Sequence, residues 1–226
     1  MNTPMIKSLI RGAALLAIVL SGAKASADTL VNQGLDSSNY GWYSTNGAQQ
    51  IAEPFSTTVS SDLTSISWFG AYESNSMTTG DFDISFYNDV GNIPDAVAFA
   101  SYSFLGLTGV DTGINTLTGY GNHWVSWTAS LPPTLLAGPA NYWVSIRGAA
   151  GTNYLWSQAP AGGDGNVVVR FADADAWQTI GGWYGRDSQS LTIEANTRSV
   201  PDASATLLLF GLGLAGVAYA RARRAA

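Results

Sequence analysis

The chain has 226 residues, 46% of them hydrophobic and 12% charged, which indicates one domain with additional terminal segments. It contains no cysteine and one histidine, which excludes a disulfide framework, thiolate-ligated metal sites and a cysteine nucleophile. The net charge of −6 argues against nucleic acid as a partner.

Residues 1–27 have the three parts of a secretory signal peptide. A basic region with Lys7 and Arg11 precedes an apolar stretch, and small residues then lead to a mature N-terminus near Asp28. A membrane anchor is the alternative, but the uncharged run 12–23 spans about 18 Å as a helix, which is shorter than the hydrocarbon core of ~30 Å. We therefore expect the Sec machinery to export the chain and signal peptidase to remove this leader.

The body, residues 28–198, contains 15 acidic and 4 basic residues, so it is far more acidic than the whole chain. An acidic body repels anionic phosphate and anionic membrane surfaces. Solubility alone explains this charge, and divalent cations or neutral molecules are the partners that it favours.

Short stretches of alternating polar and apolar residues recur through the body between clusters of Gly, Asn, Asp and Pro. In residues 81–87, for example, Phe82, Ile84 and Phe86 share one face of the predicted strand. The predicted strands are 63–69, 81–87, 97–104, 123–128, 142–147, 167–171 and 191–195.

This pattern predicts an all-β body, an antiparallel jelly-roll-like β-sandwich of about eight strands. The stretch Leu131–Leu135, which contains two prolines, is predicted to be a loop. We also predict a short linker over Asn196–Ser199, between the body and the C-terminal segment.

Carboxylates near the strand 81–87 form a candidate Ca²⁺ site. Asp81 and Asp83 share a strand face, and Asp89 follows on the adjoining turn. The EF-hand spacing is absent, and ordinary turn residues on a solvated face are the alternative. A second acidic group, beside the strand 167–171, contains Asp164, Asp173 and Asp175. No cofactor is required by this interpretation, and Ca²⁺ is its one candidate ion.

All eight tryptophans lie in the body. We expect Trp68 and one of Trp124 and Trp127 to lie in the core. Other aromatic residues in Gly- and Ser-rich surroundings are predicted to lie in loops, where flat rings stack on sugars or cover the ends of the core. The candidate carbohydrate-binding residues are Trp42, Tyr43, Trp177, Trp183 and Tyr184.

The C-terminal segment has three parts. Val200, Pro201 and Asp202 precede 18 uncharged residues, 203–220, which span about 27 Å as a helix and nearly match a bilayer core. Three arginines follow, and such a basic cluster stays on the cytoplasmic side of the inner membrane. They are Arg221, Arg223 and Arg224.

This segment, residues 199–226, resembles the PEP-CTERM sorting signal in the variant that has aspartate after Val-Pro. Ala203 stands where many members have a second proline. The resemblance implies an exported protein of a Gram-negative bacterium, a transmembrane helix at about 206–220, and processing by an exosortase, a membrane transpeptidase. Carriers of this signal are often associated with exopolysaccharide and the biofilm matrix.

A plain single-pass anchor is the alternative for the C-terminal segment. A GPI signal does not fit, because such signals end in an apolar tail and not in arginines.

The body resembles the β-sandwich domains common in exported PEP-CTERM proteins. The similarity lies in the stretch Ile66–Gly70 and in the segment Asp81–Pro94. Such domains mostly have no assigned activity.

The sequence therefore predicts a non-enzymatic surface or matrix protein that is a membrane precursor before it reaches the cell surface or is secreted. A carbohydrate-binding module, with or without Ca²⁺, remains open as an alternative, and a glycan hydrolase is a weaker one. His123 is predicted to be a surface residue, because no G-x-S-x-G nucleophile motif accompanies it.

Overall fold

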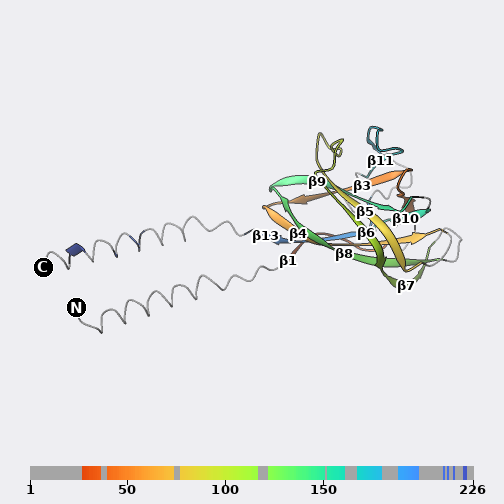
Figure 1. Ribbon diagram of the computed structural model, residues 1–226, viewed down its shortest axis with the longest axis horizontal. Helices are drawn as coiled ribbons and strands as arrows, with labels where there is room; N and C mark the ends of the chain where they lie inside the picture. Colours follow the sequence, from red (N-terminus) through yellow and green to blue (C-terminus); the bar gives the residue numbers. More distant parts are fainter. Residues whose placement is uncertain are drawn as a thin grey trace.

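The body folds into strands in the computed structural model. The structure describes residues 27–36, 40–73, 77–116, 122–150, 152–160, 167–179 and 188–198, together with Gly211, Gly213, Gly216, Arg221 and Ala222. The regular structure within 27–198 is all-β, and its strands form two antiparallel sheets (Figure 1).

The first sheet is organised around β4, which pairs with β8, β10 and β13. The last strand of the chain, β13, lies between β1 and β4. The sheet contains β1 (Ala27–Gln33), β2 (Gly41–Tyr43), β4 (Ser61–Tyr72), β7 (Val110–Asn115), β8 (His123–Leu136), β10 (Tyr154–Ser157) and β13 (Leu191–Thr197).

The second sheet has the strand order β12-β11-β3-β9-β5-β6. Its middle strands β3, β9 and β5 are joined by long antiparallel ladders. The sheet contains β3 (Gln50–Thr57), β5 (Thr79–Asn88), β6 (Ala100–Thr108), β9 (Ala140–Gly148), β11 (Val168–Arg170) and β12 (Gln178–Thr179).

Aromatic side chains fill the space between the two sheets. Phe82, on β5 of the second sheet, contacts Trp68, Trp127 and Tyr154 of the first sheet, with ring centroids 5.1, 5.0 and 5.2 Å apart. All four side chains are buried. Such tilted and edge-to-face contacts stabilise a core beyond the apolar area that they bury.

The predicted all-β class and the location of the predicted strands are confirmed. Each of the seven predicted stretches contains at least part of a strand, from β4, β5, β6, β8, β9, β11 and β13. The predicted alternation holds in the first half of β5, where Phe82 and Ile84 are buried and Asp81 is exposed. In the second half both faces are buried, because Ser85 and Tyr87 are buried as well as Phe86. The described residues contain 13 strands and not about eight, because several strands have only two to four residues.

The stretch Leu131–Leu135 is not a loop but part of β8, so this prediction is wrong. The ladder between β4 and β8 shifts register between Leu63 and Ser65, opposite this stretch. A bulge tolerates proline because no ladder hydrogen bond from that nitrogen is needed there.

Three further predictions are corrected. Asn196 belongs to β13 and not to a linker, because this strand continues to pair with β1 and β4. Trp42 lies in β2 and not in a loop. Both Trp124 and Trp127 are fully buried, where one of the two was expected in the core.

The predicted leader, residues 1–27, lies outside the described residues except for Ala27, and most of the predicted span at 206–220 does too. Gly211, Gly213 and Gly216, within that span, are helical. Among the described residues, no helix is both long and apolar enough to cross a membrane.

We expect Phe82→Ala to lower the free energy of unfolding by about 3–5 kcal/mol, because it opens a cavity among rings that cannot collapse together. Leu105→Ala is the control, since Leu105 is 83% exposed and its truncation is expected to change stability by less than about 0.5 kcal/mol. Urea unfolding of both variants measures this. Equal losses in the two variants would show that the aromatic cluster does not hold the sheets together.

Candidate functional site

The C-terminal segment begins directly after an ion pair that closes the last strand. The guanidinium of Arg198 donates from Nε and Nη2 to the two carboxylate oxygens of Asp62, both at 2.8 Å. The backbone N–H of Arg198 also donates to the carbonyl of Ser60 at 2.9 Å. The chain is therefore held against the start of β4 up to residue 198, with no free linker before residue 199.

This ion pair changes the acidity of both partners. The hydrogen bond from Arg198 is the main reason why the pKa of Asp62 lies below its ordinary value of 3.8. The same contact raises the pKa of Arg198.

The sorting residues predicted from the sequence are only partly described. Arg221 is helical and exposed. Val200, Pro201, Asp202, Arg223 and Arg224 lie outside the described residues.

The three carboxylates predicted to bind Ca²⁺ each accept hydrogen bonds from the protein. Asp81 accepts from the backbone N–H of Gly106 at 2.6 Å, and Asp83 accepts from Ser103 at 2.5 Å and from Asn46. No group of three or more acidic or histidine side chains that could hold a metal ion occurs among the described residues. The structure thus does not bring Asp81, Asp83 and Asp89 together as an ion site.

The predicted carbohydrate-binding aromatics are also dispersed. Trp42 packs partly buried against the main core, and neighbouring Tyr43 donates its hydroxyl to Glu73 at 2.8 Å. Trp177 is only 8% exposed and belongs to a second buried cluster. Trp183 and Tyr184 lie outside the described residues.

The second cluster exists because the outer face of the second sheet is also covered. On β9 the residues of both faces are buried over Tyr142–Ile146, where the alternation suggested one wet face. Trp143 lies on the outer face and packs in the same cluster as Trp177, Val168 and Tyr87. Trp177, from the segment between β11 and β12, packs over this face against Tyr87, so the sequence around β9 carries no local sign of the cover.

A buried arginine on β11 holds the segment that follows this strand against the sheet. Arg170, 5% exposed, donates from Nε to Gln50 Oε1 at 2.6 Å and from Nη1 to the carbonyl oxygen of Asp173 at 3.0 Å. Its guanidinium carbon lies 4.5 Å from the centre of the Trp177 ring. Gln50 in turn donates to Tyr87 and Ser145 at 3.0 and 2.9 Å.

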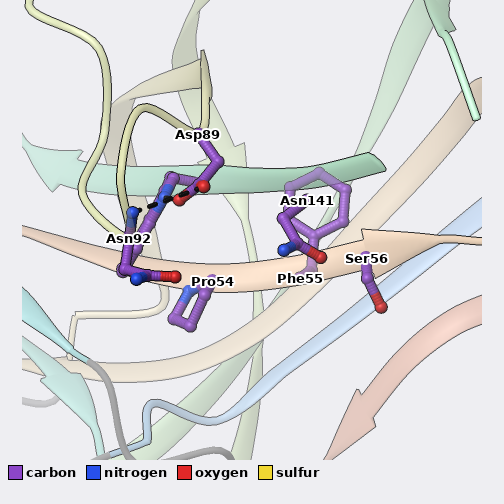
Figure 2. A pocket seen from close by; sticks show the side chains of 7 residues that line it. Pro54, Phe55, Ser56, Asp89, Asn92 and Asn141 are labelled. Carbon is purple, nitrogen blue, oxygen red and sulfur yellow. Dashed lines mark hydrogen bonds between the residues drawn. The ribbon is translucent and has the colours of Figure 1, made fainter. Parts of the chain in front are cut away.

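A small pocket of about 130 Å³ lies farther along the same outer face (Figure 2). The register of β3 and β9 sets its floor, because Pro54 is opposite Trp143 and Ser56 is opposite Asn141. The turn after β5 forms its wall. The lining residues are Pro54, Phe55, Ser56, Asp89, Asn92, Asn141 and Trp143.

The wall of the pocket is a tight turn. Gly91 and Asn92 both have positive φ, 68° and 66°, and the N–H of Val90 donates to the carbonyl of Ile93 at 2.8 Å. Two successive residues with positive φ are typical of a type I′ turn, which glycine and asparagine adopt at little cost. This confirms that the stretch from Asp89 onward is a hairpin turn.

Asp89 joins this turn to the floor of the pocket. Its Oδ1 accepts from the indole Nε1 of Trp143 at 2.7 Å. Its Oδ2 has only a long contact, 3.4 Å, with the backbone nitrogen of Asn92. Sequence reasoning selected Asp89 as a metal ligand and missed Asn141 and Ser56, whose placement depends on strand register.

His123 lies at the surface as predicted, on β8. Its Nδ1 is 3.0 Å from both carboxylate oxygens of Asp111 on β7. The pKa of Asp111 lies below its ordinary value, chiefly through the backbone N–H of Gly113 and then through His123. The pair links two strands at the rim of the first sheet.

Comparison with family models identifies the C-terminal segment. The model described as the VPDSG-CTERM motif matches residues 199–224. Comparison with curated proteins finds no match. The match supports an exosortase-type C-terminal sorting signal in a sorted, exported protein, as predicted from Val200, Pro201 and Asp202. It covers no part of the two-sheet body.

We expect Arg170→Met to lower the free energy of unfolding by roughly 2–4 kcal/mol, since it leaves buried Gln50 Oε1 without its donor and removes the cation–π contact with Trp177. Arg198→Met, at an exposed ion pair screened by water, is expected to cost clearly less. Urea unfolding of both variants measures the two losses in the free energy of unfolding. A loss no larger in Arg170→Met than in Arg198→Met would contradict the role of Arg170.

The Asp62–Arg198 pair predicts a pH dependence. Because the folded pKa of Asp62 is lowered, the pair stabilises the fold above the carboxyl's unfolded pKa, and this contribution disappears as the pH falls through the lower, folded pKa. An NMR titration of the Asp62 carboxyl carbon should give a midpoint below 3.8 that rises in Arg198→Gln. Arg147→Gln, which removes an arginine bonded to Asp173, should leave it unchanged. A midpoint insensitive to Arg198→Gln would exclude the pair as the cause.

Proposed function

We propose that this chain is a non-enzymatic surface or extracellular-matrix protein that passes through an inner-membrane precursor and is processed there by an exosortase-like transpeptidase. The observation that carries the proposal is the sorting motif at 199–224, which starts at the first residue after the Asp62–Arg198 pair. In this proposal Val200, Pro201 and Asp202 are recognised by the enzyme.

The remaining parts of the segment have separate roles in the proposal. Residues of about 206–220 form the transmembrane helix, whose length fits a bilayer core. The arginines hold the end of the chain in the cytoplasm, because positive charge resists translocation. They are Arg221, Arg223 and Arg224.

The pairing of the first and last strands supports this route. Asp28, the expected mature N-terminus at the start of β1, is opposite Ala195 near the end of β13. The two flanking segments therefore leave the body at the same end. A leader at 1–27, handled by the Sec machinery and cut by signal peptidase, and a span at about 206–220 then enter one membrane while the whole body stays on one side.

For the body we propose a jelly-roll-like β-sandwich that works in the matrix, in contact with exopolysaccharide. Its acidity disfavours anionic partners and leaves neutral glycans as the favoured class. A carbohydrate-binding module is the second candidate function, favoured by the polar pocket between β3, β9 and the turn after β5.

The sorting proposal is tested by two changes in the producing bacterium. Pro201→Ala is expected to accumulate as an unprocessed membrane precursor, because the recognition motif is altered. Replacing the three C-terminal arginines by glutamine is expected to reduce retention at the membrane before processing. Fractionation and intact-mass measurement of the secreted and membrane-bound forms give the readout.

Pro160→Ala is the matched control, since Pro160 is an exposed proline of the body. It should yield the same processed extracellular form as the wild type. If Pro201→Ala and the arginine variant also yield that form, the sorting proposal is wrong.

A further inference from the structure

The pocket beside Asp89 is lined by polar side chains that are not hydrogen-bonded elsewhere in the described structure. The side-chain amides of Asn92 and Asn141 and the hydroxyl of Ser56 make no hydrogen bond with other described residues, and all three residues are exposed. Figure 2 shows the two amides on opposite sides of the pocket, with Asp89 above and Pro54 below. The pocket is thus bordered by groups available to a ligand.

These groups suit hydroxyls. Each amide both donates and accepts, and Oδ2 of Asp89 keeps accepting capacity because its one contact, with the Asn92 nitrogen, is 3.4 Å long. Oδ1 is held by Trp143 at 2.7 Å, so the carboxylate is oriented before any ligand arrives. A fixed acceptor beside groups that both donate and accept complements neighbouring hydroxyls on one ring.

The charge of the pocket excludes other ligand classes. Asp89 is the one charged residue of its lining, and the lining contains no arginine or lysine to pair with a phosphate, sulfate or carboxylate. A Ca²⁺ ion takes six to eight oxygen ligands, and a single carboxylate supplies only one or two of them. A neutral polar ligand fits best.

The volume of the pocket limits the size of the ligand that it can hold. A volume of about 130 Å³ is at the scale of one sugar ring and is too small for two. The exposed residues on its rim leave it open to solvent, so that ring can belong to a longer chain. Pro54, on the floor, offers an apolar surface for the face of the ring.

We propose that this pocket binds one ring of a neutral polysaccharide, with Asp89 Oδ2 accepting from a ring hydroxyl while Asn92, Asn141 and Ser56 bond to its neighbours. The inference deepens the proposed matrix function and rests on it for the identity of the biological ligand. It assigns the contact to a set of residues different from the aromatic residues selected from the sequence.

The test is a titration of the full-length chain with methyl α-glucoside, methyl α-galactoside and methyl α-mannoside. A polyoxyethylene detergent keeps the chain in solution, because a maltoside detergent would itself compete for the pocket. The NMR signal of the Trp143 indole N–H reports on the site, since this group donates to Asp89. We expect a saturable shift with at least one glycoside and a Kd of roughly 1–10 mM, the range for a ligand of this size.

Two variants locate the binding. Asn141→Ala and Ser56→Ala alter exposed residues and should each weaken binding severalfold while the thermal midpoint stays that of the wild type. Asn115→Ala is the matched control, because Asn115 is an exposed strand asparagine on β7, outside the pocket lining. It should bind as the wild type does.

Several results would overturn the inference. These are no saturable shift with any neutral glycoside, unchanged binding in both Asn141→Ala and Ser56→Ala, a shift with Ca²⁺ or tetramethylammonium in place of the glycosides, or equal binding of glucuronate. The titration measures ligand binding by the body in vitro, whereas the sorting test measures where the chain is located in the cell. Failure of one therefore leaves the other result standing.

Discussion

The packing of aromatic rings between the two sheets is the contact on which the rest of the structure depends. The chain has no cysteine, so no disulfide bond joins one sheet to the other. Phe82 lies against Trp68, Trp127 and Tyr154, and these contacts hold β5 over β4, β8 and β10. This packing also determines which side chains lie on the outer face of the sheet. Successive side chains of a strand point to opposite faces, so the neighbours of each inward-pointing residue point outward. The floor of the pocket is therefore a consequence of the core.

The outer face of the second sheet is covered near one end and open to solvent near the other. Around Arg170 the face is closed, since the guanidinium binds Gln50 and Asp173 and stacks on Trp177. Farther along β9, past Trp143, that cover ends and the pocket opens. Trp143 belongs to both regions, because it packs in the covered cluster and donates to Asp89. A buried ring thus supports an exposed polar site.

Local alternation was sufficient to locate strands where one face is dry and the other wet. On β5 it located Phe82, Ile84 and Phe86 on the buried face, but on the other face Asp81 is exposed, whereas Ser85 and Tyr87 are buried. It failed on β9, where Trp143 is buried in a cluster with Trp177, which is distant in sequence. It also failed for the prolines in β8, which a bulge accommodates. The pocket could not be predicted for the same reason: Ser56 and Asn141 become neighbours only through the register of two strands separated by more than eighty residues.

The position of β13 links the fold to the sorting segment. This strand is the last of the body, yet it lies inside the first sheet, between β1 and β4. The sheet is therefore complete only after residues 191–197 have been delivered to the compartment in which the body folds. The sorting motif follows at residue 199, so in the proposed route the chain is held at the membrane while its last strand inserts. In that route, a segment that anchors the chain immediately behind β13 would keep the body in place while this strand pairs, and its later removal would release a finished fold.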